Sequence, residues 1–223
     1  LGFFSKNIKN ACMNSHNLIK KSCSLILLLF TSFFLLNSVS ARIGETKSSI
    51  ETRLSKSGGF LIKEENIIKN KQRGMPYHKY YDFLPKETEI LLYHKTVDGE
   101  MLNYKERKIS GMLSGWDVHI IYVEKKSVLE IYRRNVKINS LELPALLKLQ
   151  SGQSFWEEKN DQEIDAKEFS AFGFDYFRND KKLRAKKIGS NTLLFISMEF
   201  DQFLKKQFLT EQMEALPLSI KGF

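Results

Sequence analysis

Three histidines, His78, His94 and His119, are the side chains best suited to acid–base or metal chemistry in the sequence after its first 41 residues. A neutral imidazole binds zinc, and histidine exchanges protons near neutral pH. The three lie in separate segments, and none has a second ligand at the short spacing typical of a zinc site. We therefore interpret each as a structural or surface residue, with a zinc site gathered in space as the alternative, and we predict no metal.

A calcium loop is the second kind of metal chemistry that the spacing of side chains suggests. Asp161, Glu163 and Asp165 alternate as the first three ligands of such a loop do, because its oxygen donors recur at every second residue. The pattern then departs from that loop, since Ala166 replaces the required glycine and Phe172 replaces the bidentate glutamate. We favour a solvated polar loop here.

Strong enzymatic signatures are missing from the sequence. It contains no Gly-Lys dipeptide for a phosphate loop, no His-Glu-x-x-His, no Gly-x-Ser-x-Gly and no Gly-x-Gly-x-x-Gly. Both cysteines, Cys12 and Cys23, lie in the N-terminal stretch that we expect to be removed, which leaves no thiol for disulfides, nucleophilic catalysis or metal binding. We predict no catalytic residue and no cofactor. A hydrolase with an unrecognised carboxylate or histidine site is the alternative.

The densest group of basic residues is a candidate anion patch on or beside one predicted hairpin. Its members are Arg178, Lys181, Lys182, Arg184, Lys186 and Lys187. Such a patch would attract acidic envelope polymers or an anionic surface without specificity. We expect no nucleic acid as a partner. The interpretation that we favour is a solvated edge strand, because lysines on an edge prevent unwanted strand pairing.

Aromatic residues gather in a segment that glycine and proline bracket and that we expect to be a loop. It contains the candidate contact residues Tyr77, His78, Tyr80, Tyr81 and Phe83. Tyrosine and phenylalanine provide large, rigid contact area at small entropic cost. The favoured alternative is that these rings pin the loop onto the sheet.

The segment from Trp116 to Arg134 must position any such groups, because it is the clearest structural signal in the chain. Two runs of β-branched and aromatic residues flank a polar turn at residues 124–127, which predicts an antiparallel hairpin. Side chains alternate between the faces of a strand, and neither face of this hairpin is wholly polar. We therefore place it in the middle of a sheet with other elements packed on it.

The remaining elements follow the order helix, strands, helix, strands. This order predicts an α+β fold, an antiparallel β-sheet with short helices packed on one side. One domain covers residues 42–223, and the halves 42–138 and 139–223 as diverged copies are an alternative. In the first half we expect a helix at 46–54 capped by Thr46 or Ser48, a strand or bent strand pair at 60–69, and a strand at 90–93 with a return arm at 101–109. In the second half we expect a helix that runs from a capping box at Asn139 and Glu142 to Gly152, and then strands at 172–176, 183–188 and 193–198. A terminal amphipathic helix from Phe200 follows.

Residues 1–41 have the pattern of a secretory signal peptide. Lys20 and Lys21 precede about a dozen apolar residues and a small-x-small end at Ala41, whereas a spanning helix needs about 20. We predict export to the periplasm or medium and cleavage after Ala41. Residues 1–12 are interpreted as an artefact of the translation start, and an uncleaved anchor as the alternative, in which case the leader alone contacts the membrane. Removing four lysines leaves 31 basic against 26 acidic side chains.

The residues Ile43, Gly44, Thr46, Ile50 and Leu54 have the spacing of the first helix of the SmpA/OmlA-type envelope domain, which this segment resembles. The resemblance implies a short helical hairpin packed on a small antiparallel sheet. The sequence departs from that family, because Ser55 follows Leu54 without the family's Gly-x-Pro and the chain lacks a lipid-attachment cysteine. We therefore do not transfer the family's role in outer-membrane assembly. The opening also resembles that of uncharacterised exported bacterial proteins.

Together these features predict an exported, non-enzymatic interaction or structural module of a bacterial cell envelope. Its expected partner is another envelope protein or an anionic surface. A hydrolase acting outside the cytoplasm and a binder of anionic envelope polymers are the alternatives.

Overall fold

The computed structural model describes residues 42–108, 113–159, 169–217 and 219–220. The predicted leader and its cleavage point lie outside these residues, as do Asp161, Glu163 and Asp165 of the calcium-like pattern. The described residues belong to one compact unit. Among them, no helix is both long and apolar enough to cross a membrane.

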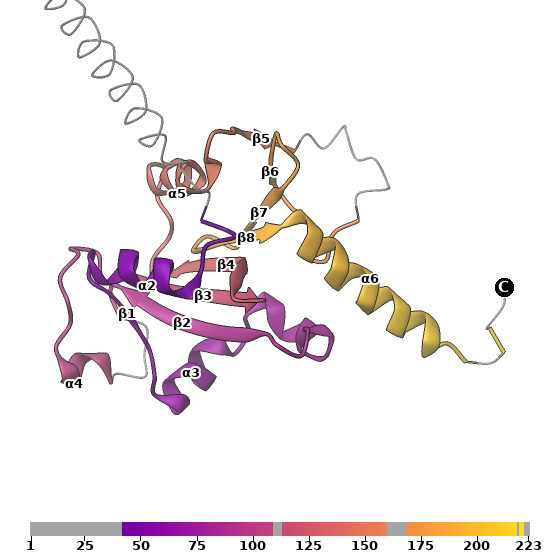
Figure 1. The fold of residues 1–223 in the computed structure, drawn as a ribbon, viewed down its shortest axis with the longest axis horizontal. Coiled ribbons are helices and arrows are strands. Elements are labelled where there is room, and N and C mark those ends of the chain that lie inside the picture. The colour runs from indigo at the N-terminus through magenta and orange to yellow at the C-terminus, as the bar shows by residue number, and fades with distance from the viewer. Residues whose placement is uncertain (1–41, 109–112, 160–168, 218, 221–223) are drawn as a thin grey trace, which may run out of the picture. The chain divides into compact units, whose positions relative to one another are not determined.

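An eight-stranded open antiparallel sheet forms the centre of the fold (Figure 1), which confirms the predicted class. The strand order is β1-β2-β3-β4-β8-β7-β6-β5, so β1 and β5 are the edges. The strands are β1 (Gly59–Leu61), β2 (Glu89–Lys95), β3 (Trp116–Val123), β4 (Lys126–Arg134), β5 (Trp156–Glu158), β6 (Tyr176–Arg178), β7 (Leu183–Ile188) and β8 (Thr192–Ser197).

The predicted hairpin is β3 and β4, which lie third and fourth in the sheet as expected. Trp116 pairs with Arg134 and Val118 with Tyr132, and the register shifts at a bulge after Ile121. Residues 124 and 125 both have positive φ, which is the backbone of a tight two-residue hairpin turn.

Helices cover both faces of the sheet, rather than the one side that the sequence suggested. Helices α2 (Lys47–Ser55) and α5 (Glu142–Ser151) pack on one face, which contains Val118 and Phe195. The 3₁₀ helix η1 (Pro76–Phe83) and α6 (Met198–Glu214) cover the other, and α3 (Glu65–Gln72) packs on β2. The cause is visible in β8, which is buried on both faces and therefore needs cover on both.

Three expected strands differ from the structure. Residues 60–69 form β1 and then α3, because Ile67 packs as part of a helix against Leu92. The expected return arm at 101–109 contains α4 (Tyr104–Arg107) instead, which a capping box between Asn103 and Glu106 begins. The expected strand at 172–176 is shorter and later, as β6.

The two predicted helix caps are confirmed, whereas the terminal helix begins at Met198, earlier than the expected Phe200. The side chain of Thr46 accepts a hydrogen bond from the amide of Ser49 at the start of α2. Asn139 and Glu142 exchange the reciprocal hydrogen bonds of a capping box before α5. The terminal amphipathic helix is α6, which Ser197 caps.

Candidate functional site

A cavity of about 260 Å³ lies between α2, α5 and the face of the sheet formed by β3 and β4. It combines a mainly apolar lining with several charged side chains. Its lining residues are Arg42, Arg53, Leu54, Ser57, Lys95, Trp116, Val118, Tyr132, Glu142, Ala145, Leu146 and Leu149.

The floor of the cavity is aromatic and comes from the central hairpin. Trp116 and Val118 are two residues apart on β3, so their side chains lie on the same face of the sheet. Tyr132 of β4 pairs with Val118 and lies on that face too. The rings of Trp116 and Tyr132 meet edge to face with centroids 6.5 Å apart. The guanidinium of Arg134 lies 5.2 Å from the centre of the Trp116 ring. The hairpin therefore holds the floor rigidly in the middle of the sheet.

The apolar walls come from the two helices. Leu54 is buried on α2 and Leu146 is buried on α5. Ala145 and Leu149 of α5 also line the cavity, and Leu141, the residue directly before α5, precedes them at the same spacing of four residues. Leu141 is 80% exposed and Leu149 is 43% exposed, so apolar surface continues from the cavity to the outside of α5.

Positive charge exceeds negative charge around this cavity. Arg53 forms an ion pair with Glu45, with Nη2 and Oε2 2.7 Å apart. Glu142 forms an ion pair with Arg134. Arg42 and Lys95 form no ion pair with any residue that the structure describes; the Nζ of Lys95 donates only to the carbonyl of Thr96, at 3.3 Å.

A buried polar network lies beside the floor, on the same face of the sheet. Glu130 is fully buried, and its Oε2 accepts from the hydroxyl of Tyr132 at 2.5 Å and from the amide of Gln150 at 2.9 Å. Burial raises the pKa of Glu130. Gln150 in turn accepts from the backbone amide of Ile43 at 3.0 Å. The network thereby joins β4, α5 and the segment that carries Arg42.

The histidines do not form a shared site. His94 and Lys71 both bond to the Oδ1 of Asp117, at 2.9 and 2.8 Å, and all three side chains are buried. His119 lies on the same face of the sheet, and its Nδ1 is 2.9 Å from the hydroxyl of Tyr77. His78 is exposed. No group of three metal-binding side chains occurs among the described residues.

Because both histidine networks are buried, we interpret them as structural contacts and not as binding or catalytic sites. Asp117 is 2% exposed and His94 is fully buried, so a ligand in solution has no access to the Lys71–Asp117–His94 network. Burial also lowers the pKa of His119 to about 3, which keeps its imidazole neutral. The networks tie α3 and η1 to the sheet.

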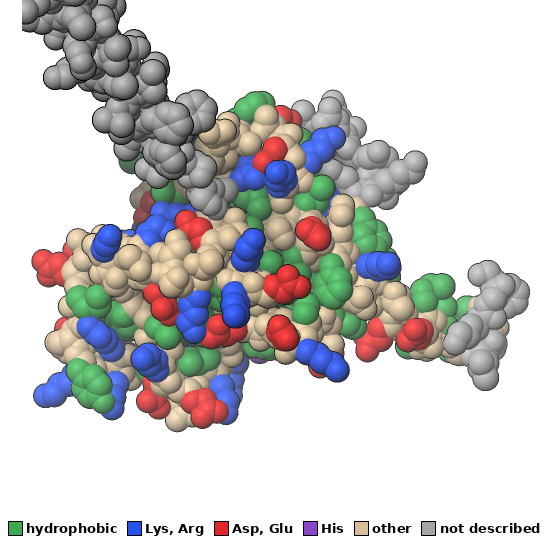
Figure 2. Space-filling view, viewed as in Figure 1, with side chains coloured by type: hydrophobic (Ala, Val, Ile, Leu, Met, Phe, Trp, Pro, Cys, Tyr) green, Lys and Arg blue, Asp and Glu red, His purple; other side chains and the backbone are tan. Residues whose placement is uncertain are grey.

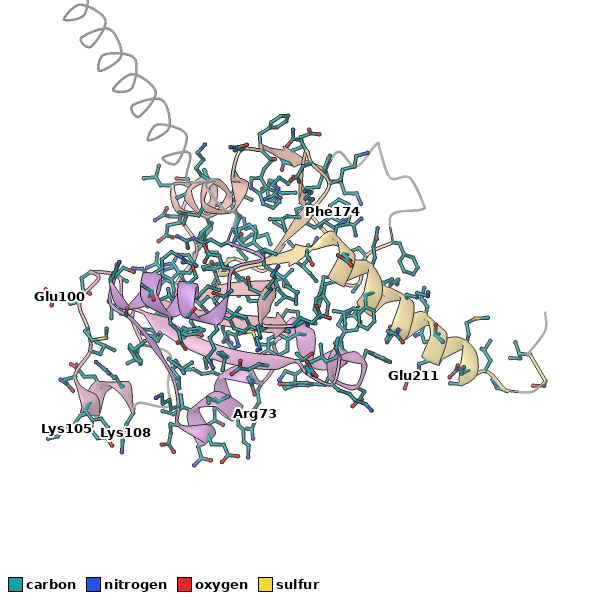
Figure 3. All side chains as sticks on the ribbon, viewed as in Figure 1. Arg73, Glu100, Lys105, Lys108, Phe174 and Glu211 are labelled. Atoms are coloured by element: carbon teal, nitrogen blue, oxygen red, sulfur yellow. The ribbon has the colours of Figure 1, made fainter. Side chains whose placement is uncertain are left out.

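The six residues of the candidate anion patch do not form one surface. Three are neutralised by carboxylates: Arg178 by Asp180, Arg184 by Asp201, and Lys186 by Asp175. Arg178 and Arg184 are buried. The guanidinium of Arg184 lies 4.6 Å from the centre of the ring of Phe174, the residue that Figure 3 labels. Lys181, Lys182 and Lys187 are exposed. The strand β7 is internal, so the edge-strand interpretation is wrong.

The aromatic segment is η1 rather than a loop, and it is anchored by its rings. Tyr77 and Tyr80 are buried, and the hydroxyl of Tyr80 donates to the carbonyl of Ala171 at 2.5 Å. Phe83 packs edge to face on Phe208 of α6, with centroids 6.0 Å apart. Of the candidate contact residues, His78 and Tyr81 are exposed, and their rings meet edge to face with centroids 4.8 Å apart.

Sequence reasoning missed the cavity, although it placed Trp116 correctly. The lining comes from α2, β2, β3, β4 and α5, which are far apart in the sequence. The local signal that could have indicated it is the spacing of four between Leu141, Ala145 and Leu149, which was not recognised in the sequence.

The fold and the cavity define an α+β protein in which two helices and an eight-stranded antiparallel sheet surround a small apolar cavity bordered by cations. No family model, curated protein or solved structure matches this chain. The resemblance of residues 43–54 to the SmpA/OmlA-type domain stays a prediction.

Proposed function

We propose that this chain is an exported, non-enzymatic binding module of a bacterial cell envelope, and that its ligand occupies the cavity between α2 and α5. The observation that carries the proposal is the combination of an apolar lining with a few charged groups in a concave site. Sites for small molecules have this character, since apolar side chains supply affinity and a few polar groups set orientation. Export rests on the leader pattern of residues 1–41.

The alternative of a hydrolase has less support. General acid–base catalysis needs ionisable groups that converge where a substrate can reach them. The buried Lys71–Asp117–His94 network lacks such access. The acidic side chain that lines the cavity, Glu142, is engaged by Arg134.

Binding of anionic envelope polymers also has less support. Three members of the basic cluster are neutralised by neighbouring carboxylates. Figure 2 shows basic and acidic side chains interspersed over the face that it displays, without a large field of one sign. A polyanion binder typically has a continuous basic surface.

Fluorescence of Trp116 tests the proposed function. In the variant Trp156→Phe the floor residue Trp116 is the sole tryptophan. We expect its emission to change with saturation when decanoate or decanol is added to the product purified after expression of the full chain. Adding Ala145→Phe, which places a ring in the cavity wall, should abolish the response.

Thr210→Phe, at an exposed position of α6, is the matched control and should leave the response intact. If neither amphiphile changes the emission at saturating concentration, or if both variants respond alike, the cavity does not bind the ligand proposed.

A further inference from the structure

We infer that the ligand of this cavity is a single-chain amphiphile with a carboxylate head group; this inference rests on the proposed function. The volume of about 260 Å³ lies just below the usual range of about 300–1,000 Å³ for small-molecule sites, which favours a small ligand such as one short chain over a branched or polycyclic body. The apolar walls would hold the chain, and Arg42 and Lys95, which form no close ion pair with a described residue, would hold the head group.

The charges on the lining specify the sign of the head group. Arg53 and Glu142 are each neutralised by an ion pair, with Glu45 and Arg134 respectively. Arg42 and Lys95 form no close ion pair with a described residue, although the charge of Arg42 acts on the buried Glu130 and that of Lys95 acts on the exposed Asp98. The lining therefore carries three cations, Arg42, Arg53 and Lys95, against the one carboxylate of Glu142. An anion beside them would form charge-assisted hydrogen bonds, whereas a cation would be repelled.

The cations also stand next to the apolar floor. Lys95 pairs with Trp116, and Trp116 pairs with Arg134, so a row across three strands places a cation on each side of the indole. A carboxylate bound at Lys95 would therefore place its chain against Trp116. Arg42 lies at the Tyr132 side: burial raises the pKa of the Tyr132 hydroxyl, and the nearby charge of Arg42 partly offsets that effect.

Unused hydrogen-bond donors provide a second observation. The Nε atoms of Arg53 and Arg134 are buried and have no hydrogen-bond partner. Buried donors without acceptors are uncommon because each one costs free energy. Arg53 lines the cavity and Arg134 stacks on Trp116 at its floor, so a bound carboxylate could accept from these donors once the two guanidinium groups turn toward it.

Removal of the leader would strengthen the site. Cleavage after Ala41, as we propose, makes Arg42 the first residue of the mature protein. Its α-ammonium then adds a positive charge to a residue that lines the cavity.

Calorimetric titration with three amphiphiles of equal chain length tests the inference: decanoate, decanol and decylamine. For the product purified after expression of the full chain, we expect decanoate to bind on the order of tenfold more tightly than decanol, and decylamine to bind most weakly. Added salt should weaken decanoate binding and leave decanol binding unchanged.

Two charge-removing variants locate the head group. Arg42→Gln and Lys95→Gln should each weaken decanoate binding several-fold and leave decanol binding unchanged. Lys148→Gln, on α5 but outside the cavity lining, is the matched control and should change neither. Circular dichroism verifies that each variant is folded.

The two proposals fail in different ways. Equal affinity for decanoate and decanol would overturn the carboxylate inference and leave the proposed function intact. If Lys95→Gln weakened the binding of decanoate and of decanol by the same factor, the inference would also be overturned, because Lys95 would then contribute packing and not its charge. Absence of binding by all three amphiphiles would overturn the proposed function itself.

Discussion

Asp117 joins three elements through one carboxylate oxygen, which bonds to Lys71 of α3 and to His94 of β2. Burial by itself would raise the pKa of Asp117, but the hydrogen bond from His94 and the charge of Lys71 outweigh burial and lower the pKa. Since burial and pairing oppose each other, the ion pair is costly to break although it is not a large source of stability.

We expect Asp117→Asn to lower the free energy of unfolding by about 3–5 kcal/mol, because Lys71 would be left as a buried charge without a counterion. Urea denaturation measures this. Glu65→Gln removes the exposed ion pair with Lys69 on the same helix α3 and should change nothing measurable. Similar effects of the two substitutions would show that the Asp117 network is dispensable.

His119 makes the free energy of unfolding decrease as the pH falls. The folded chain keeps this imidazole neutral down to about pH 3, whereas in the unfolded chain it takes up a proton below its ordinary pKa of about 6.5. Protonation thus favours the unfolded state between these values. Stability is complete above about pH 6.5 and falls with decreasing pH by up to about 1.4 kcal/mol per pH unit.

Unfolding of His119→Gln at several pH values tests this sign. Glutamine can still bond to the hydroxyl of Tyr77 but does not titrate, so stability should fall less steeply between pH 6.5 and 4 than in the parent. His78→Gln, at an exposed position, should keep the parent slope. A parent slope in His119→Gln would mean that other groups determine the acid limb.

Among the elements, the start of β3 depends on a close approach of two backbones. Gly115 has a φ of +131°, and a Cβ atom there would lie 2.2 Å from the carbonyl oxygen of Lys95. Gly74 also has positive φ, but a Cβ would meet nothing within 4 Å. Gly115→Ala thus adds a backbone clash to the conformational strain that both positions share.

We expect Gly115→Ala to destabilise the fold by more than about 2 kcal/mol, and Gly74→Ala by about 1 kcal/mol. Thermal unfolding of both variants gives the comparison. Because Lys95 borders the cavity, Gly115→Ala should also weaken decanoate binding. Equal costs at the two glycines would show that the β2–β3 approach is looser than described.

Elements defined by local patterns could be predicted, and those defined by distant contacts could not. The hairpin of β3 and β4 needs only alternation and a turn, both within 19 residues of sequence. The helix α3 was mistaken for strand because Ile67 and Ile68 form a short apolar pair that fits either element. The second helical layer was missed because residues 76–83 were expected to form a loop, bracketed by glycine and proline, although their rings were expected to pin it onto the sheet.

At the scale of the whole molecule, the candidate site could not be predicted either, because it too depends on contacts between residues that are distant in the sequence. The basic cluster looked like an anion site because lysines and arginines are adjacent in sequence, yet Asp180, Asp201 and Asp175 neutralise three of them in the fold. The cavity gathers side chains from segments between Arg42 and Leu149, and no spacing rule connects them.

Export is tested by the mass of the product. We expect expression of the full chain in a bacterial host to yield an extracytoplasmic protein whose first residue is Arg42, because the small-x-small end at Ala41 suits signal peptidase. Intact mass and N-terminal sequencing give the answer. A cytosolic product that retains residues 1–41 would contradict the localisation and remove the added charge at Arg42.

Binding in the cavity over Trp116 is the central claim, and the two tryptophans of the chain allow it to be tested within one sample. Trp116 lines the cavity, whereas the indole of Trp156 lies outside the lining and donates to the carbonyl of Leu147 at 2.7 Å. The measurement is an NMR titration of the two isotope-labelled indole signals with decanoate. We predict a saturable shift of the Trp116 signal and a much smaller shift of the Trp156 signal; equal shifts, or none, would contradict the account.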